Sequence, residues 1–471
     1  MKIEQIYTGC LAHAAYYIES KGEAAIIDPL REVQPYINRA KLDDAKIKYI
    51  FETHFHADFV SGHIDLAKKT GGKIVFGPTA KPGYDVIVAE DNQIFEVGDY
   101  KIKVIHTPGH TMESTTYLLI NENGKEHGIV TGDTLFIGDV GRPDLAQHLV
   151  SDLNEEKLAG YLFDSLRQKI MPLSDDLIVY PNHGAGSACG KNMSSETTDT
   201  LGRQKQVNYA LRADMTKDEF IKELLTGLGA PPAYFPQNVL MNINGYESLD
   251  NVMEKAHRPL SPLEFEAVVN ETEAIMLDVR HQDEFAKGHI PRSIFIGLDG
   301  DFAPWVGALI ADVKQPILLI APEGREEEAL TRLSRIGFDN TIGYLKGGFE
   351  TWKKAAMEYD TLTAIYAMEF KKAIEEKQIP IYDVRKESEY LSEHIIDANH
   401  MCLSTINNDI SKYPKDKTFY IHCQGGYRSM IASSILKNRG IHNLIDVAGG
   451  FEAIKEVGTP LTDYVCPSTL V

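Results

Sequence analysis

The side chains best suited to chemistry in the first half of the chain are histidines and aspartates. His54, His56 and Asp58 alternate directly after the apolar residues 49–51. Imidazole nitrogens and carboxylate oxygens are common ligands of zinc and iron in proteins. The pattern therefore predicts a metal site at the end of a strand.

Three further residues of these types follow other predicted strands. His110 follows the alternating residues 100–105, Asp133 follows residues 127–132, and His183 follows residues 177–181. Glycine or proline lies near each of them, which permits the tight turns that bring strand ends together. A single histidine is more often a surface residue than a ligand, but the recurrence of one context favours a shared metal site.

Length and composition limit the kinds of protein that this chain can be. Its 471 residues are enough for about three domains. No apolar run approaches the roughly 18 residues of a membrane span, and the N-terminus lacks an apolar signal core, so we expect a cytoplasmic protein that does not enter a membrane. The net charge of -20 opposes binding to nucleic acids and anionic lipids, so we expect a small-molecule substrate. The five cysteines are scattered and do not resemble a disulfide framework.

The elements expected in the first domain alternate between strands and helices. Residues 15–18, 24–27 and 73–76 read as strands, and residues 64–69 read as a helix that stops at Gly71. An amphipathic helix at residues 217–225 suggests a linker from about residue 214, and a proline-rich piece follows at residues 230–236. That piece either covers the active site or joins domains. We place the first domain at residues 1–250.

The second half of the chain repeats itself. Asp278-Val279-Arg280 is matched by Asp383-Val384-Arg385, and the Gly-Gly-Phe run at residues 347–349 is matched at residues 449–451. Short strands alternate with helices in both copies, which predicts two α/β domains with parallel sheets, at residues 251–358 and 359–471.

A reactive cysteine is predicted in the second copy. Cys423 is followed by Gln424, Gly425, Gly426, Tyr427 and Arg428 where a strand gives way to a helix. Backbone N–H groups, the helix N-terminus and the arginine favour negative charge there, and would stabilise a thiolate or a persulfide. The first copy has Ala-Pro-Glu-Gly-Arg-Glu at residues 321–326 instead, so we expect it to be an inactive spacer that orients the other two domains. A phosphatase loop of the Cys-x5-Arg kind is the nearest rival, although only four residues separate Cys423 from Arg428.

These motifs resemble known families. The order His54, His56, Asp58, His110, Asp133 and His183 resembles the metallo-β-lactamase superfamily, which implies an αββα sandwich with the metal at one edge of the sheets. The second copy is similar to a rhodanese, and its Asp-Val-Arg run favours that family over the phosphatases. The whole architecture resembles the multidomain persulfide dioxygenase–sulfurtransferases of bacteria.

The resemblance implies roles for individual residues. The two-metal hydrolases of the superfamily, such as glyoxalase II, have a second-metal histidine where this chain has Phe59, so we expect one metal. Two imidazoles and one carboxylate suit non-haem Fe(II). Likeness to the persulfide dioxygenases implies one Fe(II) per chain on His54, His110 and Asp133, with zinc as the alternative. Residues expected behind the ligands or in the substrate pocket are His56, Asp58, Arg142, Asp144, Tyr180, His183 and Cys189.

Three of these residues have alternative readings. Arg142 and Asp144 form either a structural ion pair or a substrate contact. Cys189 either accepts sulfur at the cavity mouth or fills space as a buried, inert residue.

The expected function is oxidation of a low-molecular-weight thiol persulfide by O2 to sulfite and thiol. The thiol is glutathione, coenzyme A or a similar molecule. Cys423 would then transfer sulfur among persulfide, sulfite and thiosulfate. One alternative is a zinc thioester hydrolase of the glyoxalase II kind fused to a rhodanese. Another is a sensor or scaffold with a structural metal, in which Cys423 relays sulfur to a protein partner. The sequence leaves the oligomeric state open, a homo-oligomer included.

Overall fold

The computed structural model describes residues 2–145 and 153–466. The chain forms two units: Met1–Val252 together with Leu333–Gly337, and Met253–Arg332 together with Phe338–Val471. None of the described helices combines the length and the apolar composition needed to cross a bilayer.

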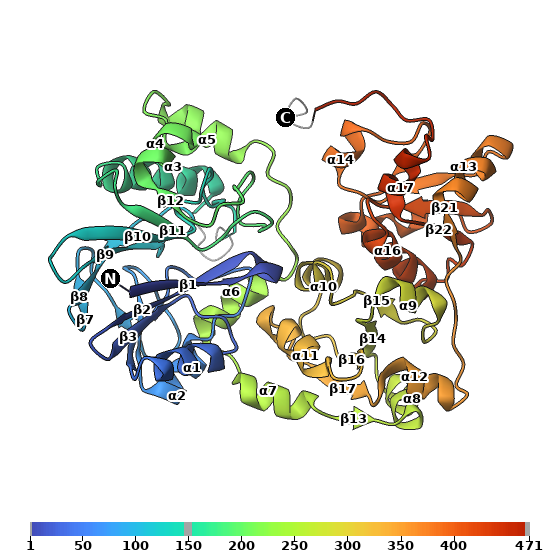
Figure 1. Ribbon diagram of the computed structural model, residues 1–471, viewed down its shortest axis with the longest axis horizontal. Coiled ribbons are helices and arrows are strands. Elements are labelled where there is room, and N and C mark those ends of the chain that lie inside the picture. Colours follow the sequence, from blue (N-terminus) through green and yellow to red (C-terminus); the bar gives the residue numbers. More distant parts are fainter. Residues whose placement is uncertain (1, 146–152, 467–471) are drawn as a thin grey trace. The chain divides into compact units, whose positions relative to one another are not determined.

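The N-terminal unit is built on two mixed sheets of six strands (Figure 1). The first sheet has the order β1 (Lys2–Thr8), β2 (His13–Ser20), β3 (Glu23–Ile27), β4 (Lys46–Phe51), β5 (Lys73–Phe76) and β6 (Ile87–Val88). The second sheet has the order β12 (Asp199–Thr200), β11 (Ile178–Pro181), β10 (Glu126–Gly132), β9 (Thr115–Ile120), β8 (Tyr100–His106) and β7 (Ile94–Val97). The helices of this part of the chain are α1 (Gln34–Leu42), α2 (His63–Thr70), α3 (Glu155–Ser165), α4 (Leu201–Val207), α5 (Lys217–Leu225), α6 (Phe235–Asn244) and α7 (Leu249–Ala256).

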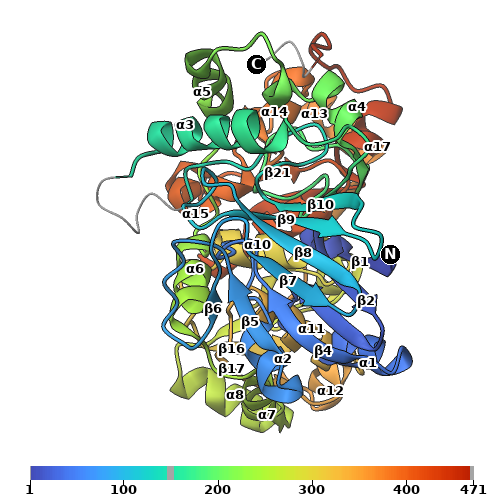
Figure 2. The same cartoon turned by 90° about the vertical axis from the view of Figure 1, so that its left-hand side faces the viewer.

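Three apolar clusters hold this unit in four layers. One cluster fills the space between the sheets and includes Phe51 of β4 and Tyr117 of β9. A second packs α1 and α2 on the outer face of the first sheet, where Leu66 of α2 is buried, and a third packs α3, α4 and α5 on the outer face of the second sheet. Figure 2 shows α1 and α2 beside β4, and α3 along β9 and β10. The αββα sandwich predicted from the sequence is confirmed.

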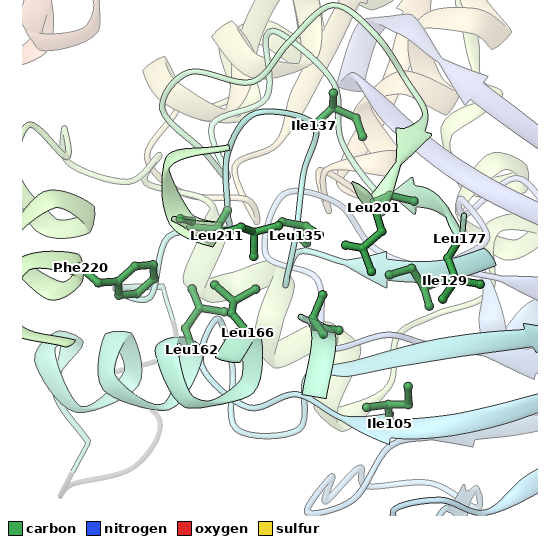
Figure 3. Close-up of a cluster of buried hydrophobic side chains, with 14 of the residues drawn as sticks. Ile105, Ile129, Leu135, Ile137, Leu162, Leu166, Leu177, Leu201, Leu211 and Phe220 are labelled. Atoms are coloured by element: carbon green, nitrogen blue, oxygen red, sulfur yellow. The ribbon is translucent and has the colours of Figure 1, made fainter. Parts of the chain in front are cut away.

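The helix α5 is part of the sandwich core. Phe220 and Leu224 are buried in the same cluster as Leu162 and Leu166, and α5 packs against α3 (Figure 3). A Thr216 capping box starts the helix, and burial of its apolar stripe fixes it in place. The helix that we expected to open a linker therefore belongs to the first domain itself.

The C-terminal unit contains two α/β repeats with the same sheet topology. The first repeat has the order β13 (Pro259–Leu260), β17 (Thr341–Leu345), β16 (Ile317–Ile320), β14 (Ile275–Asp278) and β15 (Ile294–Phe295). Its helices are α8 (Pro262–Glu271), α9 (Gln282–Lys287), α10 (Phe302–Leu309), α11 (Glu326–Arg335) and α12 (Gly348–Lys354). The second repeat has the order β18 (Ala364–Tyr366), β22 (Leu444–Ala448), β21 (Phe419–His422), β19 (Ile381–Asp383) and β20 (Asn399–His400), with helices α13 (Ala367–Glu376), α14 (Glu387–Ser392), α15 (Ile406–Asp409), α16 (Tyr427–Asn438) and α17 (Gly450–Glu456). All the strand pairs described in these two sheets are parallel, as predicted.

The repeated motifs meet in space within each repeat. Arg280 pairs with Asp278 at 2.6 Å, and its guanidinium lies 4.2 Å from the ring centre of Phe349. In the second repeat Arg385 pairs with Asp383 at 2.6 Å, and its guanidinium lies 3.8 Å from the ring centre of Phe451. The Asp-Val-Arg and Gly-Gly-Phe runs therefore recur together because they form one packing unit.

Candidate functional site

The ends of three strands bring two imidazoles and a carboxylate together. His54 follows β4, His110 follows β8 and Asp133 follows β10, and all three are buried. Their ligand atoms lie within 4.8 Å of one another. Oδ2 of Asp133 is 3.9 Å from Nε2 of His54 and 3.5 Å from Nε2 of His110. The three residues predicted to bind the metal thus form one compact group.

Hydrogen bonds behind the imidazoles direct their lone pairs toward this group. Nδ1 of His110 lies 2.7 Å from the carbonyl oxygen of Arg142, which only accepts. Nδ1 of His54 lies 2.9 Å from the Thr53 hydroxyl, whose own hydrogen goes to Asp28. Both Nδ1 atoms therefore carry hydrogen, and both Nε2 atoms present a lone pair.

The protonation and burial of the group also suit a cation. Burial, followed by the nearby imidazoles of His56 and His110, holds the pKa of His54 well below its ordinary value. Both carboxylate oxygens of Asp133 are buried without a hydrogen-bond partner among the described residues. Buried polar atoms without a hydrogen-bond partner are rare in proteins, and a bound cation would interact with both of these oxygens. The residues therefore fit a metal ion.

The segment at residues 138–144 packs directly against the group. A Cβ at Gly141 would lie 2.2 Å from the carbonyl oxygen of Asp133, so the chain passes close enough to require glycine. The Gly141 N–H donates to that carbonyl at 2.9 Å. The Arg142 guanidinium pairs with Asp144 at 2.6 Å, which is the ion pair that we weighed against a substrate contact.

His56 points into a buried acidic cluster. Its Nε2 lies 3.1 Å from Oδ1 of Asp28 and 3.3 Å from Oε2 of Glu52. Burial alone would lower the pKa of His56, but the two carboxylates outweigh it and raise that pKa well above its ordinary value. Asp28 and Glu52 were not predicted from the sequence. The feature that could have indicated them is their position, because each carboxylate directly follows an apolar strand.

Asp58, His183 and Cys189 form a neighbouring group, also within 4.8 Å of one another. Cys189 is 1% exposed, so it does not lie at the cavity mouth. Burial, and then the charges of Asp58 and Asp133, raise the pKa of its thiol well above the ordinary value. Phe59 contributes no ligand atom, and its ring packs against His56 with centroids 4.3 Å apart.

A cavity of about 620 Å³ opens beside His110. Val239 and Ile243 of α6 line part of its mostly apolar wall. Tyr234, just before α6, donates to the carbonyl of Asp58 at 3.1 Å. The proline-rich piece thus contacts the Asp58 loop through Tyr234, and the helix that follows it lines the cavity. Tyr180 is not among the residues that line this cavity, because it packs in the core between the sheets.

The loop after β21 places a backbone N–H against the Cys423 sulfur. The Gly426 N–H donates to Sγ at 3.1 Å, and Gly426 has a φ of 102°, which glycine adopts freely. A Cβ at Gly450 would lie 2.6 Å from the Cys423 carbonyl, so the Gly-Gly run supports this loop from below. Cys423 itself is buried, and a cavity of about 500 Å³ meets it.

Both repeats contribute to the Cys423 cavity. Its wall contains Gly425, Tyr427 and Arg428 of the second repeat, and Asp301 and Trp305 of the first. The Tyr427 hydroxyl donates to the Gly297 carbonyl at 2.7 Å. The first repeat therefore supplies part of this wall, a role that the sequence did not reveal.

Glu389 of α14 holds Arg428 in a two-point ion pair. The two guanidinium nitrogens lie 2.6 Å and 2.8 Å from the carboxylate oxygens. Glu389 is a third residue that sequence reasoning missed, since nothing in its sequence neighbours distinguishes it from an ordinary helix-surface glutamate. Gln424 lies close to Arg385, with Oε1 accepting from that guanidinium at 3.3 Å.

Comparison with known proteins identifies the parts of the chain. Residues 8–79 match the metallo-beta-lactamase superfamily, and residues 261–355 and 366–457 match the rhodanese-like domain. A crystal structure of a metallo-beta-lactamase from Staphylococcus aureus subsp. aureus COL is 32% identical, with a TM-score of 0.63. The alignment covers 74% of this chain and 99% of that one. The chain belongs to the metallo-beta-lactamase superfamily. This superfamily member also carries two rhodanese-like domains.

Two other proteins are similar to about half of this metallo-beta-lactamase superfamily member. A probable hydroxyacylglutathione hydrolase of Schizosaccharomyces pombe is 26% identical over 251 residues, which are 48% of this chain and 91% of that protein. The crystal structure of ETHE1 from Myxococcus xanthus is 26% identical and covers 51% of this chain and 98% of that one, with a TM-score of 0.44. That score is too low to bear on function. The superfamily and the ligand group imply a metal, and leave iron and zinc as the candidates.

Proposed function

We propose that the N-terminal domain is a non-haem iron persulfide dioxygenase, and that Cys423 is the sulfur carrier of a coupled sulfurtransferase. One persulfide, one O2 and one water would give one thiol and one sulfite. The observation that carries the proposal is the compact group of His54, His110 and Asp133, since two imidazoles and one carboxylate suit Fe(II) and leave positions open. Iron bound there would supply the redox chemistry with O2 that side chains lack.

The residues around this group suit a small thiol persulfide. The cavity beside His110 is lined by apolar side chains such as Phe55 and Leu145, which keep water away from the reacting sulfur. Lys81 and Lys157 also line it, and their charges favour the carboxylates or phosphates of a thiol such as glutathione or coenzyme A. Arg142 acts through its backbone, because its carbonyl fixes the orientation of His110.

The Cys423 loop supports the second half of the proposal. A thiolate on Cys423 would attack the sulfane sulfur of a donor, release the donor's remaining group and hold the sulfur as a persulfide. Sulfite would then remove that sulfur as thiosulfate, or the same steps would run in reverse. The Gly426 N–H already faces Sγ and would stabilise negative charge there during both steps.

The ion pair between Glu389 and Arg428 should compete with binding of the sulfur donor to Arg428. We expect Glu389→Gln to lower the KM for thiosulfate about 2- to 5-fold, because an ion pair that water partly reaches is worth up to about 1 kcal/mol and its loss frees Arg428 for a dianion. Steady-state sulfur transfer measures this. Glu387→Gln, on the exposed face of the same helix, is the control and should change nothing. A KM that rises would mean that Glu389 positions Arg428 for the donor.

A zinc-dependent thioester hydrolase is the second candidate. The named sequence relatives favour it, since several are hydroxyacylglutathione hydrolases. A hydrolase of that kind would need no O2 and would cleave glutathione thioesters in the same cavity. Phe59, which offers no ligand atom, is the feature that weighs against it.

Oxygen uptake distinguishes the two candidates. We expect the iron-reconstituted full chain to consume O2 when glutathione persulfide is added, with sulfite formed in equal amount. Metal analysis on the same sample should give iron in proportion to activity. Stoichiometric zinc in the native protein, no O2 uptake and turnover of a glutathione thioester would instead assign the domain to the hydrolases.

A further inference from the structure

The first repeat has a cavity of its own, which the proposed sulfur chemistry does not use. The cavity has a volume of about 370 Å³ and is lined by the turn at residues 321–323, by α9 and by α12. Ala321 stands there in place of a cysteine, so the cavity contains no sulfur nucleophile. Its wall carries basic and acidic side chains in equal number: Arg280, Lys287 and Lys353, and Glu284, Glu323 and Glu350.

Arg280 has hydrogen-bond donors to spare in this cavity. The side chain is only 7% exposed. Its Nη2 donates to Asp278 at 2.6 Å and to the Gly288 carbonyl at 2.8 Å, and its Nε donates to Asp278 at 2.9 Å. Nη1 donates to none of the residues that the structure describes. Because all five N–H groups of a guanidinium are donors, the two on Nη1 remain for a ligand.

The second repeat shows which group satisfies the corresponding arginine. Oε1 of Gln424 accepts from Nη1 of Arg385 at 3.3 Å, and Nε2 of the same side chain donates to Oε1 of Glu452 at 3.2 Å. One small group, with an acceptor at one end and a donor at the other, therefore bridges an arginine and a glutamate.

The first repeat keeps both charged residues and lacks the group between them. Arg280 and Glu350 take the two charged positions, but Pro322 stands at the position of the glutamine. A proline side chain offers neither an acceptor nor a donor, and the cavity opens beside it. Glu350 retains only a contact of 3.7 Å with Lys353 of its own helix. The space that the glutamine amide fills in one repeat is therefore left to a ligand in the other.

A further substitution leaves another carboxylate in this wall without its arginine. Glu284 takes the position of Glu389, which pairs with Arg428 in the second repeat. The first repeat has Glu326 in place of that arginine, and no ion pair among the described residues includes Glu284. The cavity thus offers carboxylates for a cationic group as well as an arginine for an anionic one.

We infer that this cavity of the first repeat binds a small zwitterion that carries an α-amino acid group. The carboxylate would accept from Nη1 of Arg280, and the ammonium group would donate to Glu350, as the two ends of the Gln424 amide do in the second repeat. Since the charges of the wall cancel, a ligand with both charges fits it better than a plain anion or cation. The volume is in the range of small-molecule sites.

Calorimetric titration of the full chain tests this site with three ligands that share one carbon skeleton. We expect L-2-aminobutyrate to bind at one molecule per chain. Butyrate lacks the ammonium group and propylamine lacks the carboxylate, so each should bind at least about 10-fold more weakly, as expected for loss of a hydrogen bond to a charged group. Butyrate or propylamine binding as tightly as L-2-aminobutyrate would overturn the inference, and so would the absence of saturable binding.

Variants of the first repeat locate the ligand. Pro322→Gln should weaken binding of L-2-aminobutyrate at least about 10-fold, because it restores the amide that fills this place in the second repeat. Lys287→Gln removes one charge of the wall and should weaken binding about 2- to 5-fold. Lys354→Gln is the matched control, since Lys354 is exposed on α12 and does not line the cavity. Circular dichroism checks that each variant is folded, and undiminished binding by folded Pro322→Gln would overturn the inference.

S-methylglutathione distinguishes two sources of the amino acid group. Its γ-glutamyl end carries the same carboxylate and ammonium group, and its methylated sulfur takes no part in sulfur transfer. The binding that Pro322→Gln removes belongs to the first repeat. If that component is tighter than binding of L-2-aminobutyrate, the site takes a glutathione-type ligand, and if it is weaker, the site takes free amino acids. Because these titrations contain neither O2 nor a persulfide, their outcome stands apart from the test of the dioxygenase.

Discussion

Asp133→Asn is expected to empty the metal centre and to abolish turnover in the N-terminal domain. Asparagine keeps the size of the side chain but removes the negative charge that faces His54, His110 and His183. Metal content should fall below about a tenth of the wild-type value. Replacing a residue that only hydrogen-bonds to a metal ligand already lowers metal affinity about 10- to 100-fold, and Asp133 is expected to be a ligand itself. Loss of a metal that contributes several kcal/mol to catalysis corresponds to roughly 10³-fold lower persulfide-dependent O2 uptake.

Elemental analysis and an oxygen electrode measure both effects on one preparation. Asp176→Asn is the matched control, because Asp176 is exposed and lies before β11 in the same domain. It should keep full metal content and full activity. If Asp133→Asn kept wild-type metal content, Asp133 would not be a ligand, and His54 and His110 would need another carboxylate partner.

Cys423→Ser is expected to remove sulfur transfer while sparing oxygen consumption. A serine hydroxyl is far less nucleophilic than a thiolate and forms no stable sulfur adduct, so thiosulfate-linked turnover should fall roughly 10³-fold or more. O2 uptake should change less than about 2-fold, because the metal group is held by β4, β8 and β10 and Cys423 by the β21 loop. Assays of both activities on the same sample separate the two halves.

Cys402→Ser provides the comparison for that variant. Cys402 belongs to the same repeat, is half-buried, and contacts the Ser404 hydroxyl at 3.1 Å. Its replacement should leave both activities unchanged. If Cys402→Ser lost sulfur transfer while Cys423→Ser retained it, the carrier would be Cys402, and the glycine loop around Cys423 would need another explanation.

Sequence patterns predicted the architecture because strand ends and repeats are local signals. His54, His110 and Asp133 each follow an apolar strand, and parallel or paired strands deliver such residues to one edge of a sheet. The Asp-Val-Arg and Gly-Gly-Phe runs likewise marked two domains with one topology. Periodicity and turn residues were sufficient for both predictions.

The residues that sequence reasoning missed acquire their roles only through contacts across the fold. Asp28 directly follows β3, and nothing in its neighbours predicts that the fold brings it to His56. Glu389 looks like any helix glutamate until the fold places Arg428 beside it. In both cases the partner is distant in sequence, and the contact depends on tertiary packing alone.

The pairing of Arg280 with Asp278 beneath Phe349 has a consequence for comparative genomics. The first repeat keeps this arrangement, and its Gly348, with a φ of 61°, still approaches the Ala321 carbonyl as Gly450 approaches Cys423. It has Ala321 where the second repeat has Cys423, so this packing does not depend on a thiol. The two motifs therefore mark the scaffold, and a genome search for sulfur carriers should also require a cysteine at the position of Cys423.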